Sequence, residues 1–135
     1  MTRRNTSRVE FEEYGRTVVY RRHRNGGGLV SPNASVDATA FVASDAWIED
    51  GARVGARTTV GAGSWVDVDA DVGDGVVIGP NVHVGQRAEV GDEVHLGKGV
   101  RLGADVRVAA RTRLPEDFVV APGEVVHRTR WGVAA

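Results

Sequence analysis

One aliphatic residue recurs every six positions along most of this chain. Starting at Val30 and moving in steps of six, every position as far as Val126 is Val, Ile or Leu. The residue two places before each aliphatic is small or Val almost throughout, from Ala34 to Thr112. Side chains alternate between the faces of a strand, so these two positions point to the same side. The pattern predicts one short strand and one tight turn in every six residues.

The residues between the aliphatics suit tight turns. Gly, Asn or Asp recurs three residues after the aliphatic, and these types tolerate a positive φ. They stand at Gly51, Gly63, Gly75, Asn81, Gly99, Asp105 and Asp117. Three strands then close a triangular coil of eighteen residues, and each aliphatic stacks on its counterpart in the next coil at a spacing of ~4.8 Å. We expect five to six coils.

The repeat divides the chain into three parts. Residues 29–131 are predicted to form the β-helix and residues 132–135 a short tail. Residues 1–28 fall outside the repeat, and the segment from Val9 to Tyr20, with a turn at Tyr14 and Gly15, predicts a hairpin. Gly26, Gly27 and Gly28 are interpreted as a flexible join. The end of a β-helix exposes unpaired strand edges, so this segment is expected to cap it.

The first 28 residues carry a local net charge of +4 from seven Arg and three Glu, whereas the whole chain has a net charge of −1. A second interpretation of this segment is therefore that Arg21, Arg22, His23 and Arg24 bind a phosphate or nucleic acid. Four basic residues without interleaved aromatic residues are weak support for it, and we expect no nucleic-acid partner.

The repeat resembles that of the hexapeptide-repeat superfamily: an aliphatic residue, a small or acidic one, two variable ones, a small residue or Val, and one variable one. Ile78-Gly79-Pro80-Asn81-Val82-His83 is an example. The resemblance implies an all-β, single-stranded, left-handed parallel β-helix and a homotrimer. It also implies acyl transfer from acyl-CoA or acetyl-CoA, with a histidine at a cleft between subunits as the base. The run from Leu114 to Gly123 resembles the last coil of sugar O-acetyltransferases.

The middle residue of each strand should project outward, so the outer faces can be predicted as columns of residues eighteen apart. One column contains Trp47, Trp65, His83, Arg101 and Val119, and another contains Phe41, Thr59, Val77, His95, Arg113 and Trp131. Trp47 and Trp65 should be exposed in a single chain, and we expect them at the trimer interface.

His83 is the candidate catalytic base, because imidazole titrates near neutral pH, and His95 is the alternative. In this hypothesis Trp65 packs against the acyl-pantetheine chain and Arg101 binds a CoA phosphate or the developing negative charge.

The composition excludes some kinds of chemistry and indicates where the protein is located. The chain of 135 residues has no Cys, so disulfides, thiolate nucleophiles and Cys-ligated metals are excluded. No apolar segment has the usual form of a signal peptide or the length of a membrane span, so we expect a cytoplasmic protein without a membrane partner.

The sequence favours an acyltransferase that acts on a hydroxyl or amine of a small molecule, but it leaves open whether the chain is catalytic. The alternative is a non-catalytic scaffold or assembly protein, because no insertion interrupts the coils between Val30 and Val126. A metal protein like the γ-class carbonic anhydrases is disfavoured. His83 and His95 lie twelve residues apart without a third histidine nearby, and no metal is expected.

Overall fold

The computed structural model of the protein describes residues 8–13 and 15–127, so the predicted exposed Trp131 and the tail at 132–135 lie outside the described residues. Two longer strands come first and seventeen two-residue strands follow them. The strands are β1 Arg8–Glu13, β2 Arg16–Arg22, β3 Leu29–Val30, β4 Ser35–Val36, β5 Phe41–Val42, β6 Trp47–Ile48, β7 Arg53–Val54, β8 Thr59–Val60, β9 Trp65–Val66, β10 Asp71–Val72, β11 Val77–Ile78, β12 His83–Val84, β13 Glu89–Val90, β14 His95–Leu96, β15 Arg101–Leu102, β16 Arg107–Val108, β17 Arg113–Leu114, β18 Val119–Val120 and β19 Val125–Val126.

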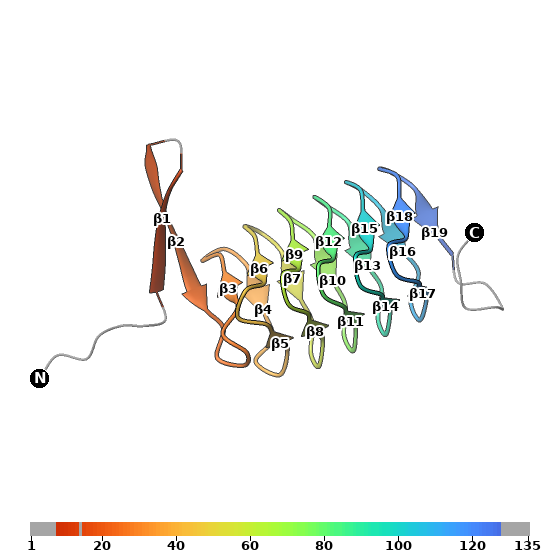
Figure 1. Ribbon diagram of the computed structural model, residues 1–135, viewed down its shortest axis with the longest axis horizontal. Helices are drawn as coiled ribbons and strands as arrows, with labels where there is room; N and C mark the ends of the chain where they lie inside the picture. The colour runs from red at the N-terminus through yellow and green to blue at the C-terminus, as the bar shows by residue number, and fades with distance from the viewer. Residues whose placement is uncertain (1–7, 14, 128–135) are drawn as a thin grey trace, which may run out of the picture.

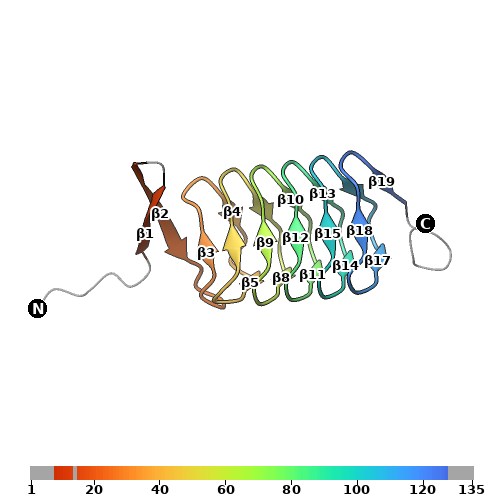
Figure 2. The same cartoon turned by 45° about the horizontal axis from the view of Figure 1, so that its top comes forward.

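The short strands form three parallel sheets around one axis (Figures 1 and 2). The sheets run β3-β6-β9-β12-β15-β18, β4-β7-β10-β13-β16-β19 and β5-β8-β11-β14-β17, and we call them sheets A, B and C. Every strand from β3 to β16 pairs in register with the strand eighteen residues further on, as β12 does with β15 through His83 and Arg101. Strands β3–β17 make five complete coils, and β18 and β19 begin a sixth. The predicted parallel β-helix is therefore confirmed.

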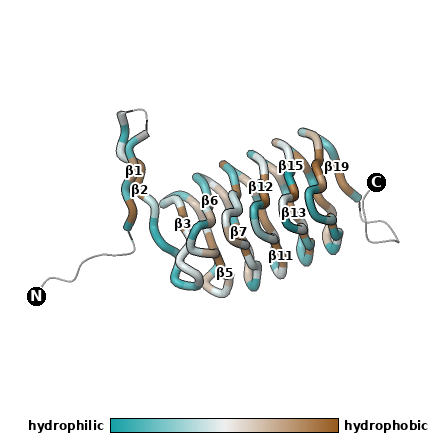
Figure 3. The backbone as a smooth tube through the Cα atoms, viewed as in Figure 1, coloured by the Kyte–Doolittle hydropathy of each residue, from teal (hydrophilic) through white to brown (hydrophobic). Residues whose placement is uncertain are grey.

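The core is the column of stacked aliphatics inside the coils. Val42, Ile48, Val60, Val66 and Leu96 have no exposed surface, and hydrophobic positions recur once per strand along each coil (Figure 3). The small residues two places before them are also buried, as Ala46, Ala70 and Ala88 show. The predicted inward positions are thus the observed ones. In the described part of the chain, no helix is long and apolar enough to cross a membrane.

The turns repeat one backbone conformation. Every sixth residue from Gly51 to Gly123 has a positive φ, including the predicted Asn81 and Asp117. The same conformation also occurs at four bulky charged residues that the sequence did not mark as turn positions: Arg57, Arg87, Glu93 and Arg111. A positive φ is uncommon for such side chains. The close packing of neighbouring coils therefore determines the backbone there, at some cost in strain.

The N-terminal segment extends sheet A. Strands β1 and β2 form an antiparallel hairpin, and β2 pairs with β3 through Arg21 and Arg22. The loop that follows hydrogen-bonds to the first strand of sheet C, with Gly28 N–H donating to Val42 O at 3.0 Å. Residues 16–28 therefore cover the first strand edges of two of the three sheets.

Two of the three glycines that the sequence suggested as a flexible join are packed tightly against the first coil. A Cβ atom at Gly28 would overlap the Val42 side chain, and one at Gly26 would overlap the Val42 carbonyl group. Glycine is needed here because the loop lies directly against the first coil. Two of the four basic residues next to it also serve the loop: Arg22 donates to Gly27 O at 2.9 Å, and the His23 ring bonds Ala40 O at 2.7 Å.

Candidate functional site

Sheet A carries the histidine that the sequence singled out. His83 lies on β12, with Trp65 on one neighbouring strand and Arg101 on the other, as the column predicted. Its imidazole is stacked on the Trp65 indole, with ring centroids 4.4 Å apart and planes inclined by 15°. About 29% of the His83 side chain is exposed, so the ring is fixed on one face and still accessible.

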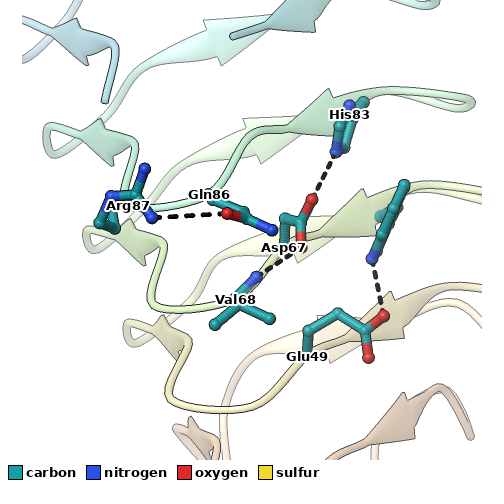
Figure 4. A network of polar contacts seen from close by, with 7 residues as sticks. Glu49, Asp67, Val68, His83, Gln86 and Arg87 are labelled. Atoms are coloured by element: carbon teal, nitrogen blue, oxygen red, sulfur yellow. Dashed lines mark hydrogen bonds and ion pairs between the residues drawn. The ribbon is translucent and has the colours of Figure 1, made fainter. Parts of the chain in front are cut away.

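A buried carboxylate holds the edge of the same ring. Asp67 Oδ2 lies 3.0 Å from His83 Nε2, and only 9% of the Asp67 side chain is exposed (Figure 4). The other oxygen, Oδ1, accepts a hydrogen bond of 2.7 Å from Val68 N–H. An ionised carboxylate only accepts, so Nε2 carries the hydrogen when Asp67 is charged. Nδ1, which has no hydrogen-bond partner among the described residues, is then left as the basic nitrogen.

Glu49 fixes the indole that lies against His83. Its Oε2 accepts a 2.9 Å hydrogen bond from Trp65 Nε1, and its Oε1 accepts a 2.6 Å hydrogen bond from Tyr20 Oη on the hairpin. Glu49, Asp67 and His83 come from three successive coils (Figure 4). The polar contacts therefore form a line along the edge of sheet A that reaches the hairpin.

A groove of about 610 Å³ lies beside this line of contacts. Strand β2 forms one wall through residues 16–20, and the turns after β3, β6 and β9 form the other through residues that include Ser31, Glu49 and Asp67. The Trp65 side chain is 41% exposed and also lines the groove. Strand β2, which lies outside the repeat, thus forms one wall of this groove.

The other residues predicted for the site or the interface are Arg101, His95 and Trp47, and they do not line this groove. Arg101 is exposed on β15, and His95 is exposed on β14 in sheet C, so His83 and His95 of one chain lie on different faces. Trp47 was predicted to be exposed in a single chain, and this was wrong. The rings of Phe11 and Tyr20 each lie 5.2 Å from the Trp47 ring, so the hairpin covers part of it.

Sequence reasoning missed Asp67, Glu49 and Tyr20. A signal for the two carboxylates was present in the repeat. The residue after the aliphatic is glycine at eight of the nine positions from 55 to 103, because the next coil approaches closely: a Cβ atom at Gly61 would lie 2.6 Å from the Gly79 backbone. At the corresponding corner of sheet A the chain instead has Ser31, Glu49 and Asp67 in successive coils. For Tyr20 there was no signal, because the hairpin lies outside the six-residue repeat and its contacts with the coils cannot be predicted by counting residues.

The described residues contain no group of three or more His, Asp or Glu side chains placed to bind a metal ion. The pair of His83 and Asp67 has the two components that proton transfer needs, a base and a group that orients it.

Comparison with known proteins supports the fold. No protein-family model and no curated protein sequence matches the chain. Among solved structures, perosamine N-acetyltransferase from Caulobacter crescentus in complex with CoA and GDP-perosamine matches with a TM-score of 0.71 at 23% identity. The match covers 72% of this chain, and this chain spans less than half of the matched structure, 46% in one crystal and 47% in another.

A hexapeptide transferase family protein from Anaplasma phagocytophilum matches more weakly, with a TM-score of 0.42 at 18% identity over 73% of this chain and 68% of that one. At these identities the similarity concerns the fold alone. The perosamine N-acetyltransferase match, with its TM-score of 0.71, confirms the parallel β-helix that the period of six predicted.

Proposed function

We propose that this hexapeptide-repeat β-helix protein is an acyltransferase that uses His83 as general base to transfer an acyl group from acyl-CoA to a hydroxyl or amine of a small molecule. One observation carries the proposal: the exposed imidazole is held by the buried Asp67 carboxylate on its edge and by Trp65 on its face. A histidine that served only the β-helix would need no such support. The matched perosamine N-acetyltransferase, which binds CoA and a nucleotide sugar, supports the reaction class.

In this proposal each nitrogen of the imidazole has one role. As the acceptor attacks the thioester carbonyl carbon, His83 Nδ1 takes the proton of its hydroxyl or amine, and the new C–O or C–N bond forms. The C–S bond then breaks, and the CoA thiolate takes the proton back from the imidazolium. Asp67 keeps the hydrogen on Nε2 and stabilises the transient imidazolium charge. The two acyl-transfer partners exchange one acyl group and one proton, so the step balances.

The neighbouring side chains would bind the donor. Arg101, exposed beside His83 in sheet A, has the charge to contact a CoA phosphate. The exposed part of the Trp65 indole supplies an apolar surface for the pantetheine arm. We also propose a homotrimer with Trp65 at the interface, because an exposed aromatic residue on a flat sheet face is typical of a subunit contact. A neighbouring subunit on that face would form a cleft around His83.

A thiol-release assay tests the reaction. The chain has no Cys, so free CoA released from acetyl-CoA can be measured with a thiol reagent without any background from the protein. With hydroxyl and amine acceptors supplied as a panel, His83→Asn should lower turnover by about a hundredfold or more. Asp67→Asn should lower it by about tenfold or more, because an amide can present N–H to Nε2 and thus favour the wrong tautomer.

The matched control is His95→Asn, since His95 is an exposed histidine at the same position of a strand in another sheet. It should keep wild-type turnover, and both histidine variants should keep the wild-type melting temperature and affinity for acetyl-CoA. Full turnover in His83→Asn would exclude His83 as the base. Loss of turnover in His95→Asn alone would assign the role to His95.

The second candidate function is a non-catalytic scaffold. The specific observation in its favour is the regularity of the body: from β3 to β19 each strand follows the last after six residues, without an insertion. Many uniform coils suit a rod that presents columns of side chains to partners. Acetyl-CoA that fails to bind the wild-type protein in calorimetry and in a thermal-shift assay would favour the scaffold over the enzyme.

A further inference from the structure

The N-terminal hairpin is tied to the edge of sheet A through one tyrosine. Tyr20 is buried, with 9% of its surface exposed, and its ring makes edge contacts with Phe11 and Trp47 at 5.7 and 5.2 Å. These contacts hold the phenol ring, and its hydroxyl donates the 2.6 Å hydrogen bond to Glu49 Oε1. The hydroxyl is therefore a fixed point to which the Glu49 carboxylate is anchored.

Glu49 transmits this fixed position to Trp65. A carboxylate bonded through one oxygen can rotate, but hydrogen bonds to both oxygens fix the direction of its plane. With Tyr20 on Oε1, Oε2 is directed at Trp65 Nε1 at 2.9 Å. Because 41% of the Trp65 residue is exposed, this bond adds to the restraint that the stacking on His83 gives its indole. The orientation of the indole then determines the stacking on His83 at 4.4 Å.

We propose that Tyr20 is a positioning residue, which acts through Glu49 and Trp65 to hold the His83 imidazole in the orientation that proton transfer requires. The hairpin is then a part of the catalytic unit as well as a cover for the sheet edges. This proposal rests on the proposed function, because it assumes that His83 is the base. Asp67 restrains the imidazole at one edge only, so the ring can still turn about that bond unless the indole restrains its face.

Three variants separate this role from simple packing. Tyr20→Phe removes only the hydroxyl and keeps the aromatic contacts. Glu49→Ala removes both hydrogen bonds. Glu49→Gln is the conservative variant, because its carbonyl oxygen accepts from Trp65 Nε1 while its amide donates to Tyr20 Oη. Thr17→Val on the same strand is the matched control, since Thr17 lines the groove and has no part in this chain of contacts.

The first readout needs no substrate. In heteronuclear NMR, Tyr20→Phe and Glu49→Ala should speed solvent exchange of the Trp65 indole N–H by about threefold or more, because its acceptor is loosened or lost. The same variants should shift the His83 ring signals, whereas Glu49→Gln and Thr17→Val should leave both sets near wild type. Tyr20→Phe added to Glu49→Ala should change nothing further, since the two side chains act in series.

The second readout is the kinetics. Tyr20→Phe should lower kcat by about tenfold at an unchanged KM for acetyl-CoA, because the base is misplaced while the donor still binds. Unchanged Trp65 and His83 signals in Tyr20→Phe would overturn the proposal. Altered Trp65 and His83 signals in Tyr20→Phe together with a wild-type kcat would also overturn the proposal, and in that case His83 would still stand as the base. A wild-type protein without acyl transfer would overturn the proposed function itself, while the NMR signals would still show whether Tyr20 positions His83.

Discussion

Thr58 and Thr112 allow a paired test of the buried hydrogen bonds inside the coils. Both are fully buried at the same inward position of the repeat. Thr58 Oγ1 donates to Gly73 O at 2.7 Å and accepts from Val76 N–H at 3.2 Å. Thr112 Oγ1 has no hydrogen-bond partner among the described residues. Replacing each by Val exchanges the hydroxyl for a methyl group at nearly constant size, so only the polar contribution differs.

The expected effects have opposite signs. Thr58→Val leaves the buried N–H of Val76 and the carbonyl of Gly73 without this partner, which should lower the free energy of unfolding by about 1–3 kcal/mol. The lower end applies if the turn relaxes so that Val76 N–H reaches Gly73 O, as Ala88 N–H reaches Gly85 O in the turn between β12 and β13. Thr112→Val removes a hydroxyl that has no hydrogen-bond partner among the described residues, so the protein should be unchanged or more stable by up to about 1 kcal/mol.

Urea unfolding followed by circular dichroism measures both values, and an unchanged m-value shows that the unfolded state is comparable. The decisive quantity is the difference between the two variants in the change of the free energy of unfolding, because the burial of the new methyl group contributes similarly to both. Equal losses in Thr58→Val and Thr112→Val would refute the reasoning, since the hydroxyl bonds would then contribute nothing that distinguishes the two sites.

Three further predictions follow from the packing and the charges. Val72 is 1% exposed, so Val72→Asp should cost several kcal/mol in urea unfolding, whereas Asp71→Asn on the exposed neighbour should stay within about 0.5 kcal/mol. The Arg87 guanidinium lowers the pKa of Asp105 below 3.8, so this pair stabilises the fold above that pH and the stabilisation is lost as the pH falls through the lowered pKa. Asp105→Asn should therefore melt slightly below wild type at pH 7, and the gap should close in acid; a gap that widens in acid would contradict the sign. Trp47→Ala removes the ring on which Phe11 and Tyr20 pack, so limited proteolysis should cut the hairpin faster while the far-ultraviolet spectrum of the coils stays unchanged.

The coils could be predicted from the sequence because each depends on a local rule that repeats. One aliphatic and one small residue per strand determine which side faces inward, and the constant spacing of six determines which residues are neighbours in the next coil. The pairing of His83 with Trp65 and Arg101 follows from counting eighteen residues in either direction. No long-range contact has to be guessed in such a fold.

The site could be predicted only in part, because its remaining members do not follow the repeat. The bond from Asp67 to His83 joins a turn to a strand sixteen residues later, so the two side chains belong to different columns. Tyr20 reaches Glu49 from a hairpin whose docking depends on aromatic contacts with Trp47. Its partial burial of Trp47 also explains why that residue was wrongly predicted to be exposed.

Because the coils are uninterrupted, the length of the β-helix can change only in steps of one coil, which is one strand spacing. Adding or deleting eighteen residues changes the length of the body by about 4.8 Å and leaves every column of side chains aligned. Such a change is harmless after β15, where it only lengthens the far end. Between β3 and β6 it would move the hairpin away from Glu49 and Trp65 by one strand spacing, and between β6 and β9 it would move Trp65 away from Glu49 and the hairpin. The number of coils before His83 is therefore constrained by the contacts between the hairpin, Glu49 and Trp65. The number of coils after His83 is not constrained by these contacts.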